Sequence, residues 1–516
     1  MNLRGVLKVF VIFFIITLPF LSACENPISS DVLVLAVEKD PVTFDPLRGT
    51  GDAVTAHILQ LIFDPLVVKD VHFNVVPRLA TFEHSDDYTV FTFHIKPGIK
   101  FQNGKDLTSA DVRYTFDTII NPDRKVPIRS DYTIISKMDT PDPLTIIFCL
   151  KQPSTNFLVT LVPVAIMAEG SADSIANNPI GTGPFRRVGY VKTQYIDFES
   201  FDGYFDGPPK VKKVRVRVIP DDSTRQLEFA NGTIDLAVNT LFSPDTIDAM
   251  SQTPGLKVEI GPGTRFYYMG INNQDPITQS KLVRQALAYG IDRDIILKQI
   301  WRNQARKANG PLPPEHWAYD PDTRVYDFNP TLASQLLDQA GYPKKTNEPR
   351  LRLRMSSSSV AQSRQVAAIF QEQLRQIGVE LELEQFETQT FTQKTRQGQY
   401  QLSYSNWVGA NEDPQFFQFS YASSSIPTEA NRYFPGNRAR YSNSEIDQLI
   451  DEASHTYDQD ARKAIYFQIQ KIIAEDLPMV PLWFASNVAV MTDRVGNVHV
   501  DPSATFYFLK DVTLKR

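Results

Sequence analysis

Residues 351–384 read LRLRMSSSSVAQSRQVAAIFQEQLRQIGVELELE. Apolar and arginine residues alternate over 351–355, which is the two-residue period of a β-strand. Apolar residues then recur at helical spacing over 366–377, and Gly378 is a typical helix end. Apolar residues alternate with glutamates over 379–384. The stretch therefore predicts a strand, a helix and a strand, which is one unit of an α/β lobe.

The rest of the chain extends this pattern. Its 516 residues exceed what one hydrophobic core usually holds, so two or three lobes are expected. Thr108, followed three residues later by Asp111, predicts a helix that ends near Pro122. Further helices are expected over 280–289 and, twice, after Ser444. The serine run 356–359 is expected to be a solvated loop.

The first 24 residues look like an export signal. Arg4 and Lys8 precede an uncharged apolar run, and the stretch ends in Leu21-Ser22-Ala23-Cys24. The apolar run is shorter than the ~20 residues that a transmembrane helix needs. Leu-Ser-Ala-Cys resembles the bacterial lipobox, in which the cysteine is lipidated and becomes the mature N-terminus. Cys24 is therefore the expected lipidation site, and several acyl chains would anchor it stably.

Charge and cysteine content exclude several classes of protein. The net charge is −6, and removing Arg4 and Lys8 with the leader makes it about −8. No basic block remains that would bind nucleic acid. Lipidation of Cys24 would leave Cys149 without a disulfide partner, and Cys149, in an apolar run, is expected to be a small buried residue.

Motifs for catalysis are missing from the sequence. The seven histidines do not form a zinc-protease motif, and no G-x-S-x-G motif is present. The acidic pairs Asp221-Asp222 and Glu412-Asp413 are more typical of turns than of acid–base catalysis. The sequence predicts no catalytic residue, metal or cofactor.

An aromatic segment is a stronger functional candidate. Tyr404, Trp407, Phe416, Phe417 and Phe419 lie close together among turn-forming residues. They could form a core strand followed by a packed cluster, or one wall of a ligand site. The sequence leaves both interpretations open.

Several blocks together carry a resemblance to a known family. In chain order they are Thr43–Pro46, Lys100–Val112, Gly181–Phe185, Val283–Leu287 with Ile291–Arg293, Ala340–Tyr342 and Ile377–Val379. With them the chain resembles the peptide, nickel and oligosaccharide family of ABC-transporter solute-binding proteins, of the dipeptide- and oligopeptide-binding type, in a lipoprotein form. The likeness covers nearly the whole mature chain.

The resemblance implies an α/β fold of the two-lobed, type II periplasmic-binding-protein kind, with an additional inserted α+β domain and a hinge between the lobes. It also implies a division of the chain. The parts are a signal peptide (1–23), a lipid-anchored tether (24–30), lobe I (31–50, 178–267 and 484–516), inserted domain II (51–177) and lobe III (268–483).

The resemblance further implies where ligand binds. In peptide-binding members, main-chain groups of the loop after the Asp-Pro turn and of the strand around the tryptophan pair with an extended ligand. The implied ligand-binding residues are Thr50, Gly51, Ala53, Tyr404, Asn406, Trp407, Val408 and Asp413. Most of the other matching blocks are expected to serve packing and turns.

One position departs from the peptide-binding pattern. Those relatives have an aspartate three residues after the tryptophan that binds the amino terminus of the peptide, and this chain has Ala410. Losing one charge-assisted hydrogen bond, which contributes roughly 1.5–3 kcal/mol, would weaken amine binding about ten- to a hundredfold. Glu412 or Asp413 could supply the charge from a shifted position.

The implied function is that of an exported receptor. It would sit in the periplasm or on the outer face of the cell membrane, anchored through Cys24, and act as a monomer. It would bind a peptide-like small solute between its lobes and deliver it to ABC permease subunits and their ATPases. The alternatives are a receptor for an oligosaccharide, an opine or a nickel chelate, a lipid-anchored hydrolase that uses Glu412 or Asp413, and a binding module that reports to a sensor.

Overall fold

The computed structural model describes residues 31–49, 52–238, 242–409, 412–433 and 436–515. The expected strand, helix and strand are present as β14 (Leu351–Ser358), α10 (Ala361–Gln376) and β15 (Val379–Phe386). The two strands pair in parallel, with Leu351 opposite Val379. This is the geometry that a crossover helix imposes on the strands it joins, and the prediction for this stretch is confirmed.

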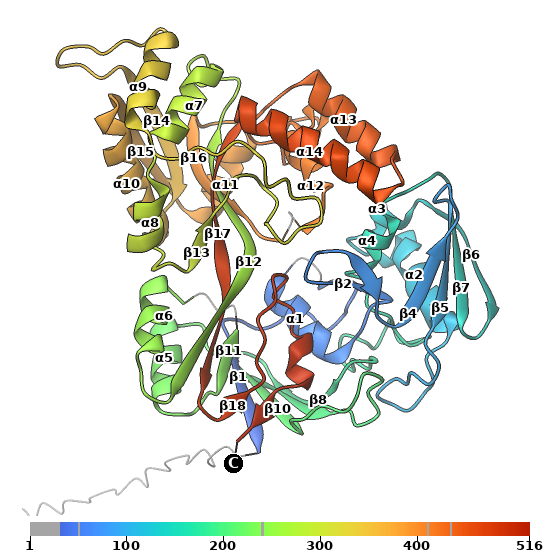
Figure 1. Ribbon diagram of the computed structural model, residues 1–516. Coiled ribbons are helices and arrows are strands. Elements are labelled where there is room, and N and C mark those ends of the chain that lie inside the picture. The colour runs from blue at the N-terminus through green and yellow to red at the C-terminus, as the bar shows by residue number, and fades with distance from the viewer. Residues whose placement is uncertain (1–30, 50–51, 239–241, 410–411, 434–435, 516) are drawn as a thin grey trace, which may run out of the picture.

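One mixed sheet of eleven strands forms the framework of the molecule (Figure 1). Its order is β15, β14, β16 (Leu402–Trp407), β12 (Leu256–Ile271), β17 (Met479–Thr492), β11 (Leu236–Val238), β1 (Val32–Val37), β10 (Lys213–Val218), β9 (Tyr195–Ser200) and β8 (Phe185–Val191), and β13 (Ala305–Lys307) pairs with β17 off this path. Figure 1 shows β14–β16 in the upper part of the molecule and β1 and β8–β11 in the lower part, which we call the upper and lower lobes.

Two long antiparallel strands, β12 and β17, run through both lobes (Figure 1). Their register is interrupted between Gly261 and Arg265. A Cβ atom at Gly263 would lie 2.2 Å from the carbonyl oxygen of Ala485, so only glycine allows the two backbones to approach here. The ladder of this strand pair, which joins the lobes, is also irregular between Tyr267 and Tyr268, and these two irregular places are where a hinge can bend.

Helices cover both faces of the sheet in the upper lobe. On β12, Tyr267 and Met269 pack on one face with α7 (Lys281–Tyr289), α9 (Pro330–Gln339) and α10. Phe266 and Tyr268 pack on the other face with α12 (Phe416–Tyr421), α13 (Ser444–His455) and α14 (Gln459–Asp476). Alternate residues of one strand therefore face two separate cores.

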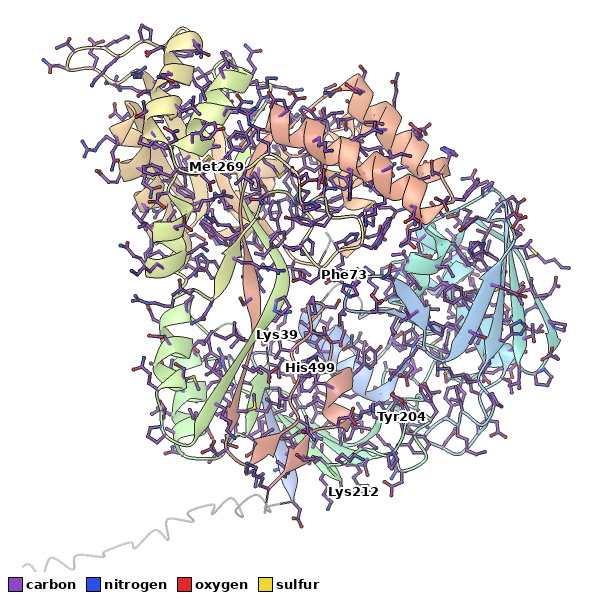
Figure 2. All side chains as sticks on the ribbon, viewed as in Figure 1. Lys39, Phe73, Tyr204, Lys212, Met269 and His499 are labelled. Carbon is purple, nitrogen blue, oxygen red and sulfur yellow. The ribbon has the colours of Figure 1, made fainter. Side chains whose placement is uncertain are left out.

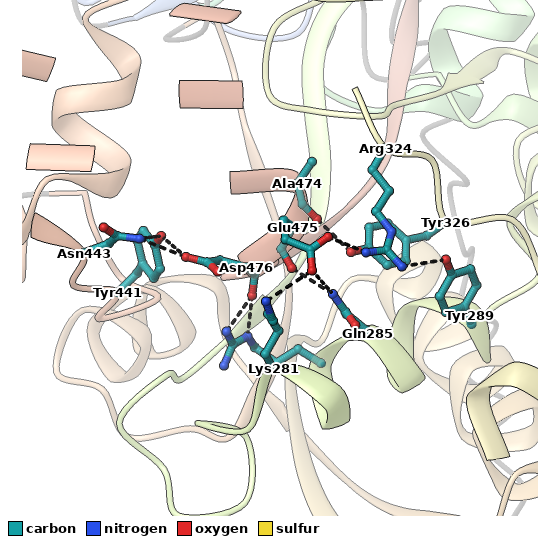
Figure 3. A network of polar contacts seen from close by, with 11 residues as sticks. Lys281, Gln285, Tyr289, Arg324, Tyr326, Tyr441, Asn443, Ala474, Glu475 and Asp476 are labelled. Atoms are coloured by element: carbon teal, nitrogen blue, oxygen red, sulfur yellow. Dashed lines mark hydrogen bonds and ion pairs between the residues drawn. The ribbon is translucent and has the colours of Figure 1, made fainter. Parts of the chain in front are cut away.

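The end of α14 is fixed to α7 by polar contacts (Figure 3). The Arg284 guanidinium donates to the Asp476 carbonyl oxygen over 2.5 and 3.0 Å, and the hydroxyl of Tyr441 donates to the Asp476 carboxylate over 2.5 Å. Lys281 and Arg324 both pair with Glu475. Arg284 belongs to the matching block 283–287, and its role in the structure is to close a helix end.

A separate four-stranded sheet lies to the right in Figure 1, in the order β4 (Ala80–His84), β5 (Val90–Ile95), β7 (Thr145–Leu150) and β6 (Ile135–Asp142). With α2 (Ser109–Ile120), α3 (Arg129–Tyr132) and α4 (Phe157–Leu161) it forms the inserted α+β domain. Thr108 and Asp111 form the expected capping box at the start of α2. This domain shares one core with the lower lobe.

Two expectations about local environment are wrong. Ser356 and Ser357 do not lie in a solvated loop, because β14 continues through them between β15 and β16 and leaves them 0% and 1% exposed. Cys149 is half-buried, because the buried residues of β7 are Ile146, Phe148 and Leu150, whose side chains point to the opposite face. The neighbouring strands thus decide the burial of the serines, and the two-residue period of β7 decides that of Cys149.

Candidate functional site

A cavity of about 260 Å³ lies where the two lobes and the segments that lead into and out of the inserted domain meet. It is lined by Pro46, Ala56, Leu59, Gln60, Phe63, Pro65, Val68, Lys69, Val162, Pro163, Ala165, Glu412, Ser503, Thr505 and Tyr507. Helix α1 (Ala53–Ile62) supplies one wall and strand β2 (Val67–Lys69) another. Segments more than 400 residues apart in the chain thus enclose one space.

The lining is apolar with a few fixed polar groups, which is typical of a site for a small organic molecule. Gln60 is held in place because its amide oxygen accepts a 2.8 Å hydrogen bond from the backbone N–H of Phe506. The nearby Ser503 and Thr505 belong to the C-terminal segment that runs along α1. Such a wall can bury hydrocarbon while a few donors and acceptors orient the solute.

Two of the lining residues, Lys69 and Glu412, carry charge, and they come from opposite sides of the cavity. Lys69 Nζ donates to the backbone carbonyl oxygen of Glu412 over 3.0 Å, but lies 3.8 Å from the nearer carboxylate oxygen. The other carboxylate oxygen accepts a 3.2 Å hydrogen bond from the hydroxyl of Thr264. The side chains of Lys69 and Glu412 are 13% and 17% exposed, so this is a loose ion pair in a sheltered place.

The electrostatics of Glu412 follow from this geometry. Burial raises the pKa of its carboxyl to about 7, and the charge of Lys69 and the Thr264 hydrogen bond oppose that rise only in part. From the described side chains the carboxylate accepts this one hydrogen bond, which leaves most of its lone pairs unused. Glu412 can therefore accept further hydrogen bonds from a molecule in the cavity.

A second carboxylate, Asp64, lies behind the wall between Phe63 and Pro65. It is 0% exposed and accepts hydrogen bonds from Arg78 (2.9 Å), Tyr204 (3.1 Å) and Thr182 (3.2 Å). Burial raises the pKa of Asp64, and the charge of Arg78 opposes the rise. The Arg78 guanidinium also lies 4.7 Å from the ring centroid of Tyr507, so this network positions a residue of the cavity wall.

The turn between β2 and β3 (Val75–Pro77) reaches across to the upper lobe. Its Phe73 is 2% exposed and stacks on His316 with ring centroids 5.5 Å apart, and Figure 2 labels it between β2 and the loop above. The carbonyl oxygen of His72 accepts a 3.2 Å hydrogen bond from the backbone N–H of Trp317. Together with the Lys69 contact, this turn joins the segment that lines the cavity to the upper lobe.

Of the predicted ligand-binding residues that the structure describes, none is among the residues that line the cavity. Thr50 and Gly51, and the departure at Ala410, fall outside the described residues, as do Cys24 and the leader. Ala53 is exposed at the first turn of α1. Asp413 accepts a 2.9 Å hydrogen bond from the backbone N–H of Gln415 just before α12, so its carboxylate is used locally.

The predicted residues on and after β16 have different surroundings. Tyr404 is 3% exposed and packs in the core against Tyr267 and Trp483. Asn406 and Val408 are exposed. Trp407 is half-buried, with the guanidinium of Arg438 4.4 Å from its ring centroid. The aromatic segment thus supplies core residues, and Trp407 lies at their edge.

Sequence reasoning missed Lys69, Phe73 and Tyr507, and it named Glu412 only as an alternative. A weak signal existed for Lys69, which ends the short apolar run Val67-Val68 with a charge. No local pattern connects it to Glu412, which is 343 positions away. The pair becomes visible only in the folded chain.

Comparison with known proteins decides the family. The model of the bacterial extracellular solute-binding proteins, family 5, matches residues 74–428. The chain belongs to this family. It is 26% identical to the dipeptide-binding protein of Escherichia coli K12, over 93% of this chain and 94% of that protein. It is also 26% identical to heme-binding protein A of Haemophilus influenzae, over 90% and 89% of the two chains.

Solved structures of the family 5 proteins share the fold. The crystal structure of the ABC transporter substrate-binding protein CtaP of Listeria monocytogenes superposes with a TM-score of 0.83 at 26% identity, over 94% of this chain and 99% of that one. The expected type II periplasmic-binding-protein fold is therefore confirmed. These relatives are binding proteins. Within the described part of the chain, no helix combines the length and apolarity that a membrane span requires.

Proposed function

We propose that this family 5 protein is the solute receptor of an ABC importer and binds a peptide-like small molecule between its lobes, without changing it chemically. The observation that carries the proposal is the mostly apolar cavity of about 260 Å³ whose charged lining groups are Lys69 and Glu412. A carboxylate with unused acceptors and a nearby ammonium suit a solute that has both an amino and a carboxylate group. The kinship with a dipeptide-binding protein agrees with this choice.

The remaining parts of the proposal concern the chain as a whole. We propose the division into lobe I (31–50, 178–267 and 484–516), inserted domain II (51–177) and lobe III (268–483). The interrupted register of β12 at Gly261–Arg265 supports a bend near the boundary between lobe I and lobe III at residues 267 and 268. Export, a lipid anchor at Cys24, action as a monomer and delivery to permease subunits complete the proposal. Thr50, Gly51, Ala53, Asn406, Trp407 and Val408 remain candidates for main-chain or stacking contacts.

Native mass spectrometry of the gently purified protein without residues 1–24 tests this function. A heterogeneous ladder of peptide masses, released on denaturation, is the expected result. A single non-peptide mass would reassign the receptor to a sugar, an opine or a chelate. A protein that is empty and unchanged by a panel of these solutes would contradict the receptor function, and turnover of a bound peptide or glycoside would favour a hydrolase.

A matched pair of variants tests the cavity itself. Replacing Glu412 by Gln keeps the shape of the side chain and removes its charge, so binding of an amine-bearing peptide should weaken about ten- to a hundredfold. Glu380→Gln, on the exposed outer strand β15, is the control and should bind like the wild type. Isothermal titration calorimetry with one peptide measures both. Equal affinities in the two variants would place the solute elsewhere.

A further inference from the structure

Among the described residues, three buried N–H donors on and near β16 and α11 (Thr388–Arg396) have no hydrogen-bond partner. They are Nε1 of Trp407, Nε of Arg438 and Nε of Arg396. The guanidinium of Arg438 lies 4.4 Å from the ring centroid of Trp407, and the charge of Arg438 acts on Arg396. A buried donor without a partner costs about 1–3 kcal/mol. These three N–H groups find no acceptor within the described part of the chain, so one ligand chemistry would serve them together.

The arginines of this region also lack counter-ions. Among the described residues, no carboxylate lies within 4.0 Å of a charged nitrogen of Arg396, Arg432, Arg438 or Arg440, whereas Arg217 and Arg306 in other parts of the chain have close partners in Glu228 and Glu315. Burial lowers the pKa of Arg396, and the positive charge of Arg438 lowers it further. Like charges are thus held together in a partly desolvated place without compensation, which is unfavourable for the protein alone.

Polar groups surround Arg438. Arg438 borders a small cavity of about 10 Å³ that is lined by polar groups including Tyr268, Ser403 and Ser405. The hydroxyl of Tyr268 has Ser405 and Arg438 as hydrogen-bond neighbours. The hydroxyl of Tyr400 donates to the carbonyl oxygen of Arg438 over 2.6 Å, which fixes the backbone of that arginine.

Arg396, which lies close enough to Arg438 to feel its charge, lines an open groove of about 400 Å³ along α11. Besides Arg396 and Arg432, the groove is lined by side chains that hydrogen-bond readily: Thr388, Gln389, Thr392, Gln393, Gln397 and Tyr433. Guanidinium groups with hydroxyl and amide neighbours are the usual partners of carboxylate and phosphate oxygens. The groove gives such a group access to the arginines from solvent.

We propose that Arg396, Arg432 and Arg438 form an oxyanion-binding site on the upper lobe, which takes a carboxylate- or phosphate-bearing molecule through the groove along α11. Arg438, stacked on Trp407, is the pre-positioned inner guanidinium, and Arg396 and Arg432 pair with the anion from the groove. The site goes beyond the proposed receptor function, because it lies apart from the cavity that contains Glu412 and needs no solute there.

Titration of the whole mature protein with citrate and, separately, with inorganic phosphate tests the site, with thermal unfolding and calorimetry as readouts. Sodium chloride at matched ionic strength controls for screening. The expected result is saturable binding of at least one of the two anions, and the stronger one shows whether carboxylate or phosphate is preferred. Arg396→Met and Arg438→Met should each weaken it at least tenfold, because each removes a charge-assisted contact.

Control variants keep the outcome clear. Arg352→Met, on an exposed strand position, should bind the anion like the wild type, and so should Glu412→Gln, whose effect belongs to the cavity alone. Arg438→Lys keeps the charge and should retain part of the binding if Arg438→Met folds poorly. No saturable binding of either anion, or equal binding in the wild type and both methionine variants, would overturn the proposal. Neither result would bear on solute binding in the cavity.

Discussion

Asp64 and Glu412 are carboxylates on two sides of the same cavity, and their surroundings differ. Asp64 accepts hydrogen bonds from three side chains and is fully buried. Within the described part of the chain, the Glu412 carboxylate accepts one hydrogen bond from a side chain, and the nearest ammonium group lies 3.8 Å away. A carboxylate whose acceptors are filled holds a fold together, whereas one with unused acceptors can receive a ligand. The number of completed hydrogen bonds, more than burial, distinguishes these two carboxylates.

The largest expected effect comes from breaking the satisfied network. Replacing Arg78 by Met leaves Asp64 buried without its cation, so the free energy of unfolding should fall by about 3–5 kcal/mol. Urea unfolding measures the loss. The double variant Asp64→Leu/Arg78→Met should recover much of it, because no unpaired charge remains. A loss below about 1 kcal/mol in Arg78→Met would mean that the network is not structural.

The stacking of Phe73 on His316 of the upper lobe should give the next largest effect. Phe73→Ala removes a ring that is 2% exposed against the upper lobe, and truncating a buried phenylalanine costs about 3 kcal/mol or more. Because the ring joins two parts of the molecule, residues 67–77 and 313–319 should exchange their amide hydrogens faster. Hydrogen exchange with mass spectrometry measures this. Val71→Ala, at a 48% exposed position of the same turn, should leave exchange unchanged.

The pH dependence of stability sharpens the comparison at Glu412. The pKa of this carboxyl rises from 4.5 to about 7 on folding, so the folded chain holds the proton more tightly than the unfolded chain. Stability is therefore greatest below the unfolded pKa and falls as the pH rises toward 7. The contribution of Glu412 to the free energy of unfolding should drop by about 2 kcal/mol between pH 5 and 7.

Urea unfolding across this pH range in the wild type and in Glu412→Gln measures that contribution as a difference. The glutamine variant should lack it, and Glu380→Gln, at an exposed ion pair, should keep it. Parallel pH profiles for the wild type and Glu412→Gln would mean that the carboxylate is better solvated than its position indicates.

The features that the sequence predicts well are those fixed by neighbours in the chain. The period of two over 351–355 and the period of 3.6 over 366–377 are enough for β14, α10 and β15, and Thr108 with Asp111 is enough to start α2. The burial of Ser356 could not be predicted, because it depends on β16 lying beside β14. Hydroxyl groups look solvated in a sequence and become buried when strands are added on both sides.

The same limit applies to the site. The resemblance indicates the region after Trp407 as part of the ligand site. In that region the charged residue that lines the cavity is Glu412, whereas Asp413 accepts a hydrogen bond within the turn that it begins. Two neighbouring carboxylates cannot be distinguished by residue type, because the backbone direction decides which one faces the cavity. Lys69 and Glu412 meet across 343 positions, and only the packing of β2 and the turn after it against the upper lobe brings them together.

The smallest expected effect belongs to ion pairs on the surface. Arg352 and Glu380 form a 2.9 Å contact between β14 and β15, with side chains that are 76% and 58% exposed. Solvent screens such a pair, so Arg352→Ala should change the free energy of unfolding by less than about 0.5 kcal/mol in the same urea assay. A loss above about 1 kcal/mol would show that distance alone, without burial or completed hydrogen bonds, is enough to make a charge pair structural. Asp64 and Glu412 would then have to be distinguished on other grounds, because the 3.8 Å Lys69–Glu412 contact could contribute to stability as the Arg78 contact does.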